Sequence, residues 1–344
     1  MDNERPLNIV HVILSRGFAG SERSTAESCN QQCQDNQVTL VVRKDHRRHG
    51  ASIVDHVDSR VQVIELPSLF FTRFFLARAL AEIKPDIVHA HLRRSTRLVA
   101  KVDTEAKKVS TLHITVNGPH FARMDGLIAN ARWQLKDIPP DFKGQVFKAN
   151  NSLIPHRRLS ADEIAALRRE LEIDDQQMLI GAVGRYKPTK GWDTLIKAFL
   201  QLPQYRHARL LFFGAGSLES ELKALAADDS RIRFIGFRND IKDLYQVFDL
   251  AVCPSRFEPL PRVMLEAMDG GAPLIASDIG GCIELIEDYG GLSFEVDNVD
   301  DLKNKLAQCM ENPPPRHRPD LSAHYIENAN RAMLDFYRSL VAAS

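Results

Sequence analysis

Residues 256–268 read Arg-Phe-Glu-Pro-Leu-Pro-Arg-Val-Met-Leu-Glu-Ala-Met, which places two carboxylates eight positions apart. Glu258 lies in a segment stiffened by prolines, and Glu266 lies in an apolar run with helical spacing. Pro261 suits the first position of a helix, where the missing N–H of proline costs nothing. The spacing therefore predicts a helix over residues 262–268, with one glutamate before it and one inside it.

Short apolar runs alternate with stretches of helical spacing on both sides of this helix. This alternation favours parallel sheets with helices on both faces, and a break at residues 150–158 divides it. We therefore predict an α/β protein of two doubly wound, Rossmann-like domains, residues 1–152 and 153–326, that face a central cleft. A helical tail at residues 323–343 could pack on either domain. The predicted strands cover residues 7–14, 38–42, 61–65, 87–90, 108–113, 178–183, 208–214, 232–235, 250–253 and 273–276. The predicted helices cover residues 21–33, 73–84, 191–200, 218–227, 241–247 and 262–268.

The composition is that of an ordinary globular protein. The chain has 344 residues, 44% of them hydrophobic and 26% charged, and no apolar run as long as a membrane span. The polar start of the chain argues against a signal peptide, and five cysteines form no paired framework. We therefore expect a cytoplasmic protein with reduced thiols and no nucleic-acid partner.

The net charge of zero hides an asymmetry. Residues 1–150 carry 22 Lys and Arg against 16 Asp and Glu, whereas the rest of the chain carries 23 against 29. The basic half could face a phosphorylated acceptor or a lipid headgroup, and ordinary surface scatter is an equal alternative.

Four phenylalanines gather within residues 68–76 and could dip into a membrane interface beside a basic set further back in the chain. The alternative is a helix packed into the core, and exposed aromatic surface would favour the membrane. The membrane interpretation implies a peripheral location at the inner face of the cell membrane, with an anionic membrane surface as partner. The basic set consists of Arg43, Lys44, Arg47 and Arg48.

The start of the helix over residues 262–268 offers an anion site. The N–H groups of Arg262, Val263 and Met264 lack helical partners, and a diphosphate binds well at such an end. Glu266 lies about 6 Å deeper at 1.5 Å per residue, which suits a carboxylate that accepts hydrogen bonds from a ribose. Glu258 can reach the sugar beyond the diphosphate. The segment therefore predicts a cradle for a nucleotide sugar.

A second segment, Gly184-Arg185-Tyr186-Lys187-Pro188-Thr189-Lys190-Gly191, follows the first predicted strand of the second domain. Doubly wound sheets bind ligands at the carboxyl ends of their strands. Arg185 offers a planar fork for phosphate oxygens and Lys190 adds a mobile charge, so the two could stabilise a departing diphosphate. Alone this segment could be a basic surface loop, but together with the Glu258 segment it indicates phosphate binding.

Three features of the first domain could meet a ligand. Gly20 precedes a predicted helix and offers N–H groups to an anion, although the spacing is not a dinucleotide fingerprint. His113 lies at a strand end, where it could contact a transferred sugar or an acceptor. His89 and His91 alternate onto one face, so a metal pair is conceivable, but a structural or acceptor-side role is favoured. The sequence has no Asp-x-Asp triplet, so we expect no metal and no other cofactor.

These motifs resemble retaining glycosyltransferase family 4, which has the GT-B fold. Glu258 and Glu266 match the E-x7-E motif of that family, and Arg185 and Lys190 match its G-R-x-x-x-x-K-G diphosphate motif. The resemblance is strong over about residues 176–300 and extends to the first domain. Further matches in the family order are Gly214-Ala215-Gly216, residues 236–240, Gly280-Gly281 with Glu284, and the hinge at residues 151–154.

The resemblance implies an enzyme that transfers a sugar from a nucleoside diphosphate sugar to an acceptor hydroxyl, with retention of configuration and without a metal. Arg185 and Lys190 would stabilise the leaving diphosphate, Glu258 the sugar and Glu266 the ribose, while His113 would orient the sugar. A final helix at about residues 327–344 would cross back onto the first domain. The implied donor-binding residues are Gly20, Gly184, Arg238 near the base, Leu260, Pro261, Arg262, Val263 and Glu266.

Two residues depart from the family pattern, since Ala19 replaces a glycine of the phosphate loop and Pro261 replaces another glycine and removes one N–H. The phenylalanine cluster and the basic half favour a glycan or glycolipid acceptor of the bacterial envelope, such as lipopolysaccharide core. The alternatives are another sugar enzyme of this fold, a phosphorylase or a nucleotide-sugar epimerase, and a non-catalytic nucleotide-sugar binding protein.

Overall fold

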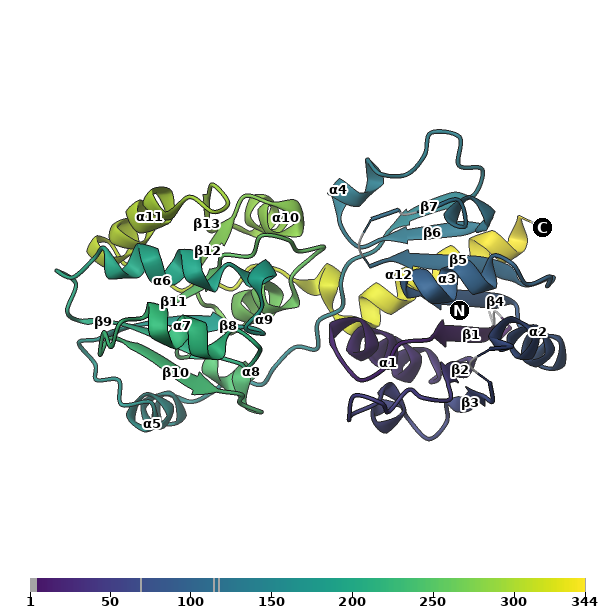
Figure 1. Ribbon diagram of the computed structural model, residues 1–344, viewed down its shortest axis with the longest axis horizontal. Coiled ribbons are helices and arrows are strands. Elements are labelled where there is room, and N and C mark those ends of the chain that lie inside the picture. Colours follow the sequence, from purple (N-terminus) through teal and green to yellow (C-terminus); the bar gives the residue numbers. More distant parts are fainter. Residues whose placement is uncertain (1–4, 69, 114, 117, 344) are drawn as a thin grey trace. The chain divides into compact units, whose positions relative to one another are not determined.

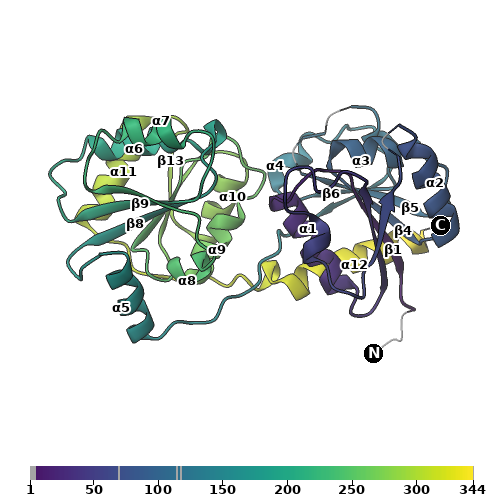
Figure 2. The ribbon, with the colours of Figure 1, turned by 60° about the horizontal axis from the view of Figure 1, so that its bottom comes forward.

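The computed structural model describes residues 5–68, 70–113, 115–116 and 118–343. Contacts divide the chain into two units: the residues up to 152 together with those from 323 onward, and residues 153–322. In each unit a parallel sheet carries helices on both faces (Figures 1 and 2). This confirms the prediction of two doubly wound α/β domains.

The first unit has a seven-stranded sheet in the order β3-β2-β1-β4-β5-β6-β7. The strand order reverses between β1 and β4, and at such a point the two loops that follow the strands diverge and leave room for a ligand. The strands are β1 (Asn8–Ile13), β2 (Gln37–Arg43), β3 (Gln62–Leu66), β4 (Ile87–His91), β5 (Lys107–Leu112), β6 (Gly126–Ala129) and β7 (Gln145–Lys148). The helices are α1 (Gly20–Gln32), α2 (Thr72–Ile83), α3 (Leu92–Val99), α4 (Arg132–Leu135) and α12 (Ile326–Ala342), with 3-10 turns at Ile53–His56, Phe121–Arg123 and Ser322–His324.

The last helix, α12, belongs to the core of the first unit. Phe336, Tyr337 and Leu340 pack against buried residues of β1, β4, β5 and β6. Phe336 also stacks on Phe147 with ring centroids 5.2 Å apart. A Cβ added to Gly126 would lie 2.8 Å from the Phe336 ring, so a glycine in β6 lets the helix approach the sheet. The chain therefore returns to its first unit to complete one face of that sheet.

The second unit has a six-stranded sheet in the order β10-β9-β8-β11-β12-β13, which reverses between β8 and β11. Its strands are β8 (Met178–Val183), β9 (Ala208–Phe213), β10 (Ile232–Gly236), β11 (Leu250–Cys253), β12 (Leu274–Ser277) and β13 (Leu292–Phe294). Its helices are α5 (Ala161–Glu170), α6 (Trp192–Leu200), α7 (Glu219–Leu225), α8 (Ile241–Leu244), α9 (Arg262–Gly270), α10 (Gly280–Tyr289) and α11 (Val299–Glu311), with a 3-10 turn at Pro188–Lys190.

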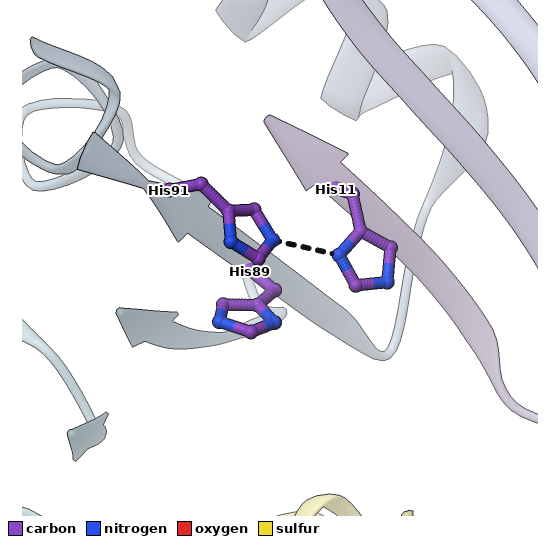
Figure 3. Close-up of side chains that lie close together, drawn as sticks. All are labelled: His11, His89 and His91. Atoms are coloured by element: carbon purple, nitrogen blue, oxygen red, sulfur yellow. Dashed lines mark hydrogen bonds between the residues drawn. The ribbon is translucent and has the colours of Figure 1, made fainter. Parts of the chain in front are cut away.

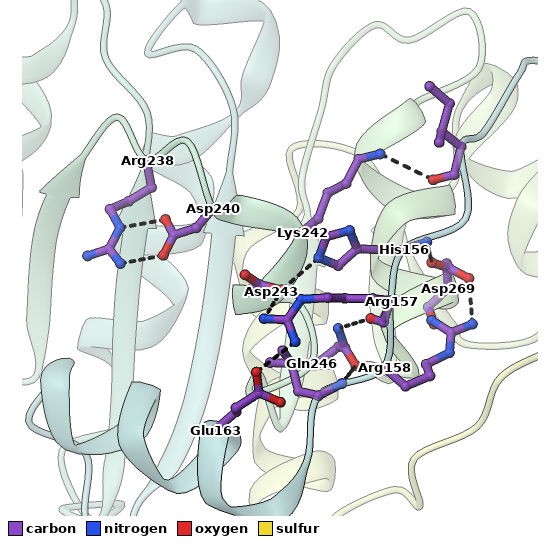
Figure 4. Close-up of polar contacts among 12 residues, drawn as sticks. His156, Arg157, Arg158, Glu163, Arg238, Asp240, Lys242, Asp243, Gln246 and Asp269 are labelled. Carbon is purple, nitrogen blue, oxygen red and sulfur yellow. Dashed lines mark hydrogen bonds and ion pairs between the residues drawn. The ribbon is translucent and has the colours of Figure 1, made fainter.

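Polar contacts fasten the first segment of the second unit to α8 and α9 (Figure 4). Asp269 accepts the backbone N–H of His156 at 3.0 Å and pairs with Arg158 at 2.8 Å. The His156 ring contacts Asp243 at 2.6 Å, and the Gln246 amide donates to the Arg157 carbonyl. These contacts hold residues 156–158, which belong to no helix or strand, against α8 and α9.

We predict that Phe336→Ala lowers the free energy of unfolding of the first unit by about 3–5 kcal/mol, because it leaves a cavity against β6 and β7. In a Trp192→Phe background Trp133 is the sole tryptophan, so its fluorescence during urea unfolding reports on the first unit alone. Arg331→Ala, an exposed position on the same helix, is the control and should change stability by less than about 0.5 kcal/mol. A loss below about 1 kcal/mol for Phe336→Ala would contradict the packing role.

Candidate functional site

Most of the predicted site residues of the second unit lie in the loops that follow the carboxyl ends of β8 and β11. These strands are neighbours where the strand order reverses, so the loops after them lie at the usual ligand position of a doubly wound sheet. Residues 184–191 follow β8 and residues 254–261 follow β11. The site is therefore built from two segments that are distant in the sequence.

Glycines let these loops approach backbone to backbone. Gly191 has φ +66°, and a Cβ there would lie 1.9 Å from the Pro254 carbonyl oxygen. A Cβ on Gly281 would lie 2.2 Å from the carbonyl oxygen of Pro259, and the Gly281 N–H donates to the Glu258 carbonyl at 3.2 Å. Any side chain at these two glycines would push the Glu258 loop away from its neighbours.

Lys190 and Glu258 form an ion pair across the two loops. Only 20% of the Lys190 side chain and 12% of the Glu258 side chain are exposed, so water screens the pair weakly. The Ser255 hydroxyl also donates to Glu258 at 3.2 Å. Burial lowers the pKa of the Lys190 ammonium, but Glu258 together with Cys253 and Cys282 raises it, and the net shift is upward. Lys190 is therefore charged at neutral pH. The sequence motifs predicted both residues but not their contact.

Arg256 fixes the Glu258 loop, a role that the sequence analysis missed. Its guanidinium pairs with Asp193 at 2.9 Å and with Asp297 at 2.7 Å, and it donates to the Pro188 carbonyl at 2.6 Å. The backbone N–H of Arg256 also donates to the Thr189 carbonyl. A single side chain thus connects the β11 loop to the β8 loop. The signal available in the sequence was an arginine two positions before the motif glutamate.

The other predicted residues of the second unit lie near these loops with different exposure. Arg185 is exposed and its carbonyl accepts the Trp192 indole N–H at 3.0 Å, whereas Glu266 and Leu260 are buried. Gly184 directly follows β8 and has φ +153°. Arg262 and Val263 begin α9 and are half-buried.

Two details of the anion-site prediction were wrong. Pro261 is the residue before α9 rather than its first residue, with φ −76° and ψ 114°. The Met264 N–H, predicted to face a ligand, donates to the Pro261 carbonyl at 3.1 Å within the first helical turn.

The guanidinium of Arg238 pairs with Asp240 through two hydrogen bonds of 2.6 and 2.8 Å (Figure 4). It also pairs with Glu170 at 2.5 Å. Both carboxylates stabilise its charge. A role of Arg238 near a nucleotide base stays a prediction.

In the first unit, the carboxylate of Glu22 already occupies the anion site that was predicted at Gly20. Gly20 begins α1, and Glu22 in the first turn accepts the N–H of Ala19 at 3.1 Å and the hydroxyl of Ser21 at 3.0 Å. Glu22 is 5% exposed. A phosphate at this helix end would meet a buried negative charge, which disfavours binding there.

His113 directly follows β5 and joins a buried histidine cluster. His11, on β1, contacts His91, on β4, at 2.9 Å between ring nitrogens (Figure 3). His91 also contacts His113 at 3.3 Å. Burial lowers the pKa of His113 to about 4, against a weaker upward effect of Glu22. His11 was not among the predicted site residues.

The ring nitrogens of His11, His89 and His91 lie within 4.8 Å of one another, close enough for a metal. Each of these nitrogens nevertheless has a side-chain hydrogen-bond partner. His89, for example, contacts the Tyr337 hydroxyl at 2.7 Å and the Thr111 hydroxyl at 2.6 Å. Hydrogen bonding accounts for the cluster as it stands.

The phenylalanine segment exposes aromatic surface, as the membrane interpretation required. Phe70, Phe71 and Phe74 are 93%, 68% and 63% exposed, whereas Phe75 packs against the core, and Leu69 lies outside the described residues. The basic set is only partly available: Arg43 is buried beside Asp45, which corrects that assignment, and Arg47 pairs with Asp55. None of the helices among the described residues combines the length and apolar character that a membrane span requires.

Comparison with known proteins places the second unit in a family. Residues 163–331 match the family model described as "Glycosyl transferases group 1". The second unit belongs to this family.

Relatives and solved structures extend the likeness. The chain is 34% identical over 164 residues, 44% of this chain and 43% of the relative, to a GDP-mannose-dependent monoacylated alpha-(1-6)-phosphatidylinositol monomannoside mannosyltransferase from Corynebacterium glutamicum. It is 24% identical to the lipopolysaccharide core biosynthesis glycosyltransferase LpsE from Rhizobium meliloti, over 76% of each chain. The chain spans less than half the length of the first curated relatives it matches.

The structure of HepE from Anabaena in complex with UDP and glucose superimposes with a TM-score of 0.79 at 20% identity, over 97% of this chain and 100% of that one. This likeness shows that the GT-B fold covers both units.

We predict that Gly191→Ala destabilises the second unit by at least about 2 kcal/mol more than Gly290→Ala. Gly191 (φ +66°, ψ 23°) lies in the left-handed region, where an L-residue costs about 1–2 kcal/mol. Gly290 (φ +92°, ψ 167°) lies in a region adopted almost only by glycine, so backbone strain alone does not make the Gly191 substitution the more costly one. Only Gly191 places its new Cβ against a backbone oxygen, since nothing lies within 4 Å of a Cβ on Gly290. Urea unfolding followed by Trp192 fluorescence in a Trp133→Phe background compares them. Equal losses of unfolding free energy in the two variants would show that the Glu258 loop can shift to accommodate the added Cβ at little cost.

Proposed function

We propose that the chain is a glycosyltransferase that moves a sugar from a nucleoside diphosphate sugar to an acceptor hydroxyl with retention of anomeric configuration. The observation that carries the proposal is the half-buried Lys190–Glu258 pair, with the exposed Arg185 on the same loop as Lys190, at the strand-order reversal of a glycosyl transferases group 1 domain.

Lys190 has three N–H donors, and Glu258 accepts only some of them. The remaining donors of Lys190 and the planar fork of Arg185 suit diphosphate oxygens, and they gain most as charge builds on the leaving oxygen. Glu258 would stay at the sugar, where its carboxylate accepts hydroxyl protons and stabilises positive charge near the anomeric carbon. Glu266 would accept from the ribose.

In the proposed step, the bond between the anomeric carbon and the diphosphate oxygen breaks, and the acceptor oxygen bonds to that carbon on the same face. The acceptor proton passes to the departing phosphate oxygen. Enzymes that use a carboxylate nucleophile hold two carboxyl groups close to the anomeric carbon. Glu266 is assigned to the ribose here, so Glu258 is proposed as an electrostatic stabiliser. No metal or other cofactor enters this step.

The acceptor is proposed to be a bacterial envelope glycan or glycolipid. Two of the matched relatives act on a phosphatidylinositol mannoside or in lipopolysaccharide core biosynthesis, according to their names. The exposed Phe70, Phe71 and Phe74 suit a peripheral enzyme that meets such an acceptor at the inner face of the membrane.

We expect Arg185→Met and Lys190→Met each to weaken binding of the preferred nucleotide at least tenfold, or about 1.4 kcal/mol. Thermal shifts with UDP-, GDP- and ADP-sugars identify the preferred nucleotide, and calorimetric titration measures the loss. Lys187→Met removes an exposed lysine of the same loop and should leave affinity unchanged. Wild-type affinity in both Arg185→Met and Lys190→Met would refute the phosphate role.

Glu258→Gln should lower turnover at least a hundredfold while nucleotide affinity changes only a few-fold, because the carboxylate acts on the sugar. Single-turnover transfer or donor hydrolysis measures the first quantity and titration the second. Trapping of a covalent glycosyl adduct on Glu258 would replace the front-face mechanism with a nucleophilic one.

For membrane contact, we predict that the triple variant Phe70→Ser, Phe71→Ser, Phe74→Ser loses at least nine-tenths of its binding to phosphatidylglycerol vesicles. Burial of one such side chain contributes about 1.5–3 kcal/mol. Phe237→Ser, at a 75% exposed position in the second unit, is the control for general stickiness. Sedimentation with vesicles compares the three proteins, and equal binding would exclude this segment as the membrane contact.

A further inference from the structure

A continuous series of buried hydrogen bonds in the first unit ends at His113. Asn330, on α12, donates through Nδ2 to the Ile326 carbonyl at 3.0 Å. Gln32, on α1, donates through Nε2 to Asn330 Oδ1 at 3.1 Å, and Gln32 Oε1 contacts His11 Nε2 at 2.9 Å. His11 Nδ1 then contacts His91 Nε2, and His91 Nδ1 contacts His113 Nε2.

The first two links of this series have a fixed direction. A backbone carbonyl can only accept a hydrogen bond, so the Asn330 amide must turn its nitrogen to Ile326 and its oxygen to Gln32. Gln32 must then present its nitrogen to Asn330 and its oxygen to His11. The orientation of both amides thus follows from one backbone oxygen rather than from a choice between equivalent flips.

The three histidines continue the same donor-to-acceptor direction because each of them is neutral. A neutral imidazole has one nitrogen that donates and one that accepts. Burial lowers the pKa of His11 to about 4, against the opposite effect of its Gln32 bond, and lowers those of His91 and His113 as well. His11 donates from Nε2 to Gln32, so its Nδ1 is bare and accepts from His91 Nε2–H. His91 Nδ1 is bare in turn and accepts from His113 Nε2–H. The remaining nitrogen of His113, Nδ1, therefore carries a lone pair.

His113 lines a pocket of the first unit that, with its open mouth, holds about 430 Å³. The lining residues that the structure describes include no Asp, Glu, Lys or Arg, and most carry hydroxyl, amide or imidazole groups, among them Ser24, Thr111, Asn130 and Asn151. Neutral donors and acceptors of this kind suit a polyhydroxylated group rather than a phosphate or carboxylate.

We propose that the series from Asn330 through Gln32, His11 and His91 holds His113 as its Nε2–H tautomer, so that His113 accepts a hydrogen bond from a sugar hydroxyl in this pocket. Asn330, Gln32, His11 and His91 are positioning residues in this scheme. The ligand class follows from the acceptor character of Nδ1: it takes a neutral sugar with a free hydroxyl and disfavours a carboxylate, whose lone pairs would face its own. The tautomer rests on the hydrogen bonds and on the neutrality of the three buried histidines, and the sugar rests on the proposed function.

Glu22 is the charged group that acts on His113, and its carboxylate favours a proton there. That carboxylate already accepts the Ala19 N–H and the Ser21 hydroxyl, which reduces its demand for a further donor. A doubly protonated His113 at pH 7 would reverse the proposed character of the pocket, so the test must report on both nitrogens.

The direct test is long-range proton–nitrogen NMR of the full chain with ring-labelled histidine, with His113 assigned from the spectrum of His113→Gln. At pH 7 we expect His113 Nε2 to have the shift of a protonated nitrogen and Nδ1 that of a bare nitrogen. A proton on Nδ1, alone or together with one on Nε2, would overturn the proposal. The result itself is read from the wild-type spectrum, and only the assignment of the His113 signals requires a folded variant.

Two variants test the series at a distance. Asn330→Leu frees the Gln32 amide to flip, and Gln32→Met removes the acceptor of His11, so both should give His113 a mixture of tautomers with intermediate nitrogen shifts. Ser110 lies on the same strand as Thr111 but outside the series, and its hydroxyl forms a buried hydrogen bond with Thr96. Ser110→Ala removes that bond and should leave the His113 shifts unchanged. If Asn330→Leu and Gln32→Met also leave them unchanged, the residues do not position His113.

Titration of the wild-type protein identifies the source of the hydroxyl. A change in the His113 signal with UDP-glucose or GDP-mannose, but not with the free nucleotides, assigns the pocket to the transferred sugar. A change with methyl glucoside or methyl mannoside alone assigns it to the acceptor. Glucuronate that binds and protonates His113 would contradict the neutral-sugar assignment. Nucleotide-sugar binding with a proton on His113 Nδ1 removes the tautomer proposal and leaves the proposed function intact. If His113 has the expected tautomer but no nucleotide sugar binds, the tautomer proposal stands and the proposed function is refuted.

Discussion

The ion pair between Lys190 and Glu258 joins two loops that leave neighbouring strands where the strand order of the second sheet reverses. Removing one partner of a mostly buried pair leaves an uncompensated charge, which typically costs about 3–5 kcal/mol. The loops can meet only because glycine stands at position 191, and Arg256 holds them together from the outer side. The pair thus depends on backbone geometry first and on charge second, and the exposed Arg185 lies on the same loop as Lys190.

The first unit reverses its strand order in the same way but places neutral groups at that point. His11 and His91 lie on the two strands that flank the reversal, and both are fully buried and uncharged at neutral pH. Glu22 occupies the helix end where an anion would otherwise bind. Two sheets of the same topology therefore carry different chemistry. The second offers fixed charges suited to a diphosphate, and the first offers directed hydrogen bonds suited to hydroxyl groups.

The fold class followed from apolar periodicity, yet several elements escaped it for physical reasons. Strand β7 reads Gln-Val-Phe-Lys and β13 has three residues, so neither gives a run long enough to stand out. Helix α3 begins directly after β4 at Leu92, which adopts φ +66°, without the turn residues that usually separate a strand from a helix. Helix α11 has a clear apolar face and an Asn298 cap, and its spacing could have been recognised.

Site residues were predictable where local spacing encodes local geometry, as for Glu258 before a helix and Lys190 before a glycine. Their contact was not, because 68 residues separate them and only the strand order brings β8 beside β11. His11 shows the same limit, since a single histidine among Ile and Val gives no signal of its own. Once β1 is known to pair with β4, however, the register sets His11 opposite His89 and Ile13 opposite His91. A doubly wound order with β1 beside β4 could therefore have been used to predict the histidine cluster, because strand adjacency converts three separate residues into one buried group.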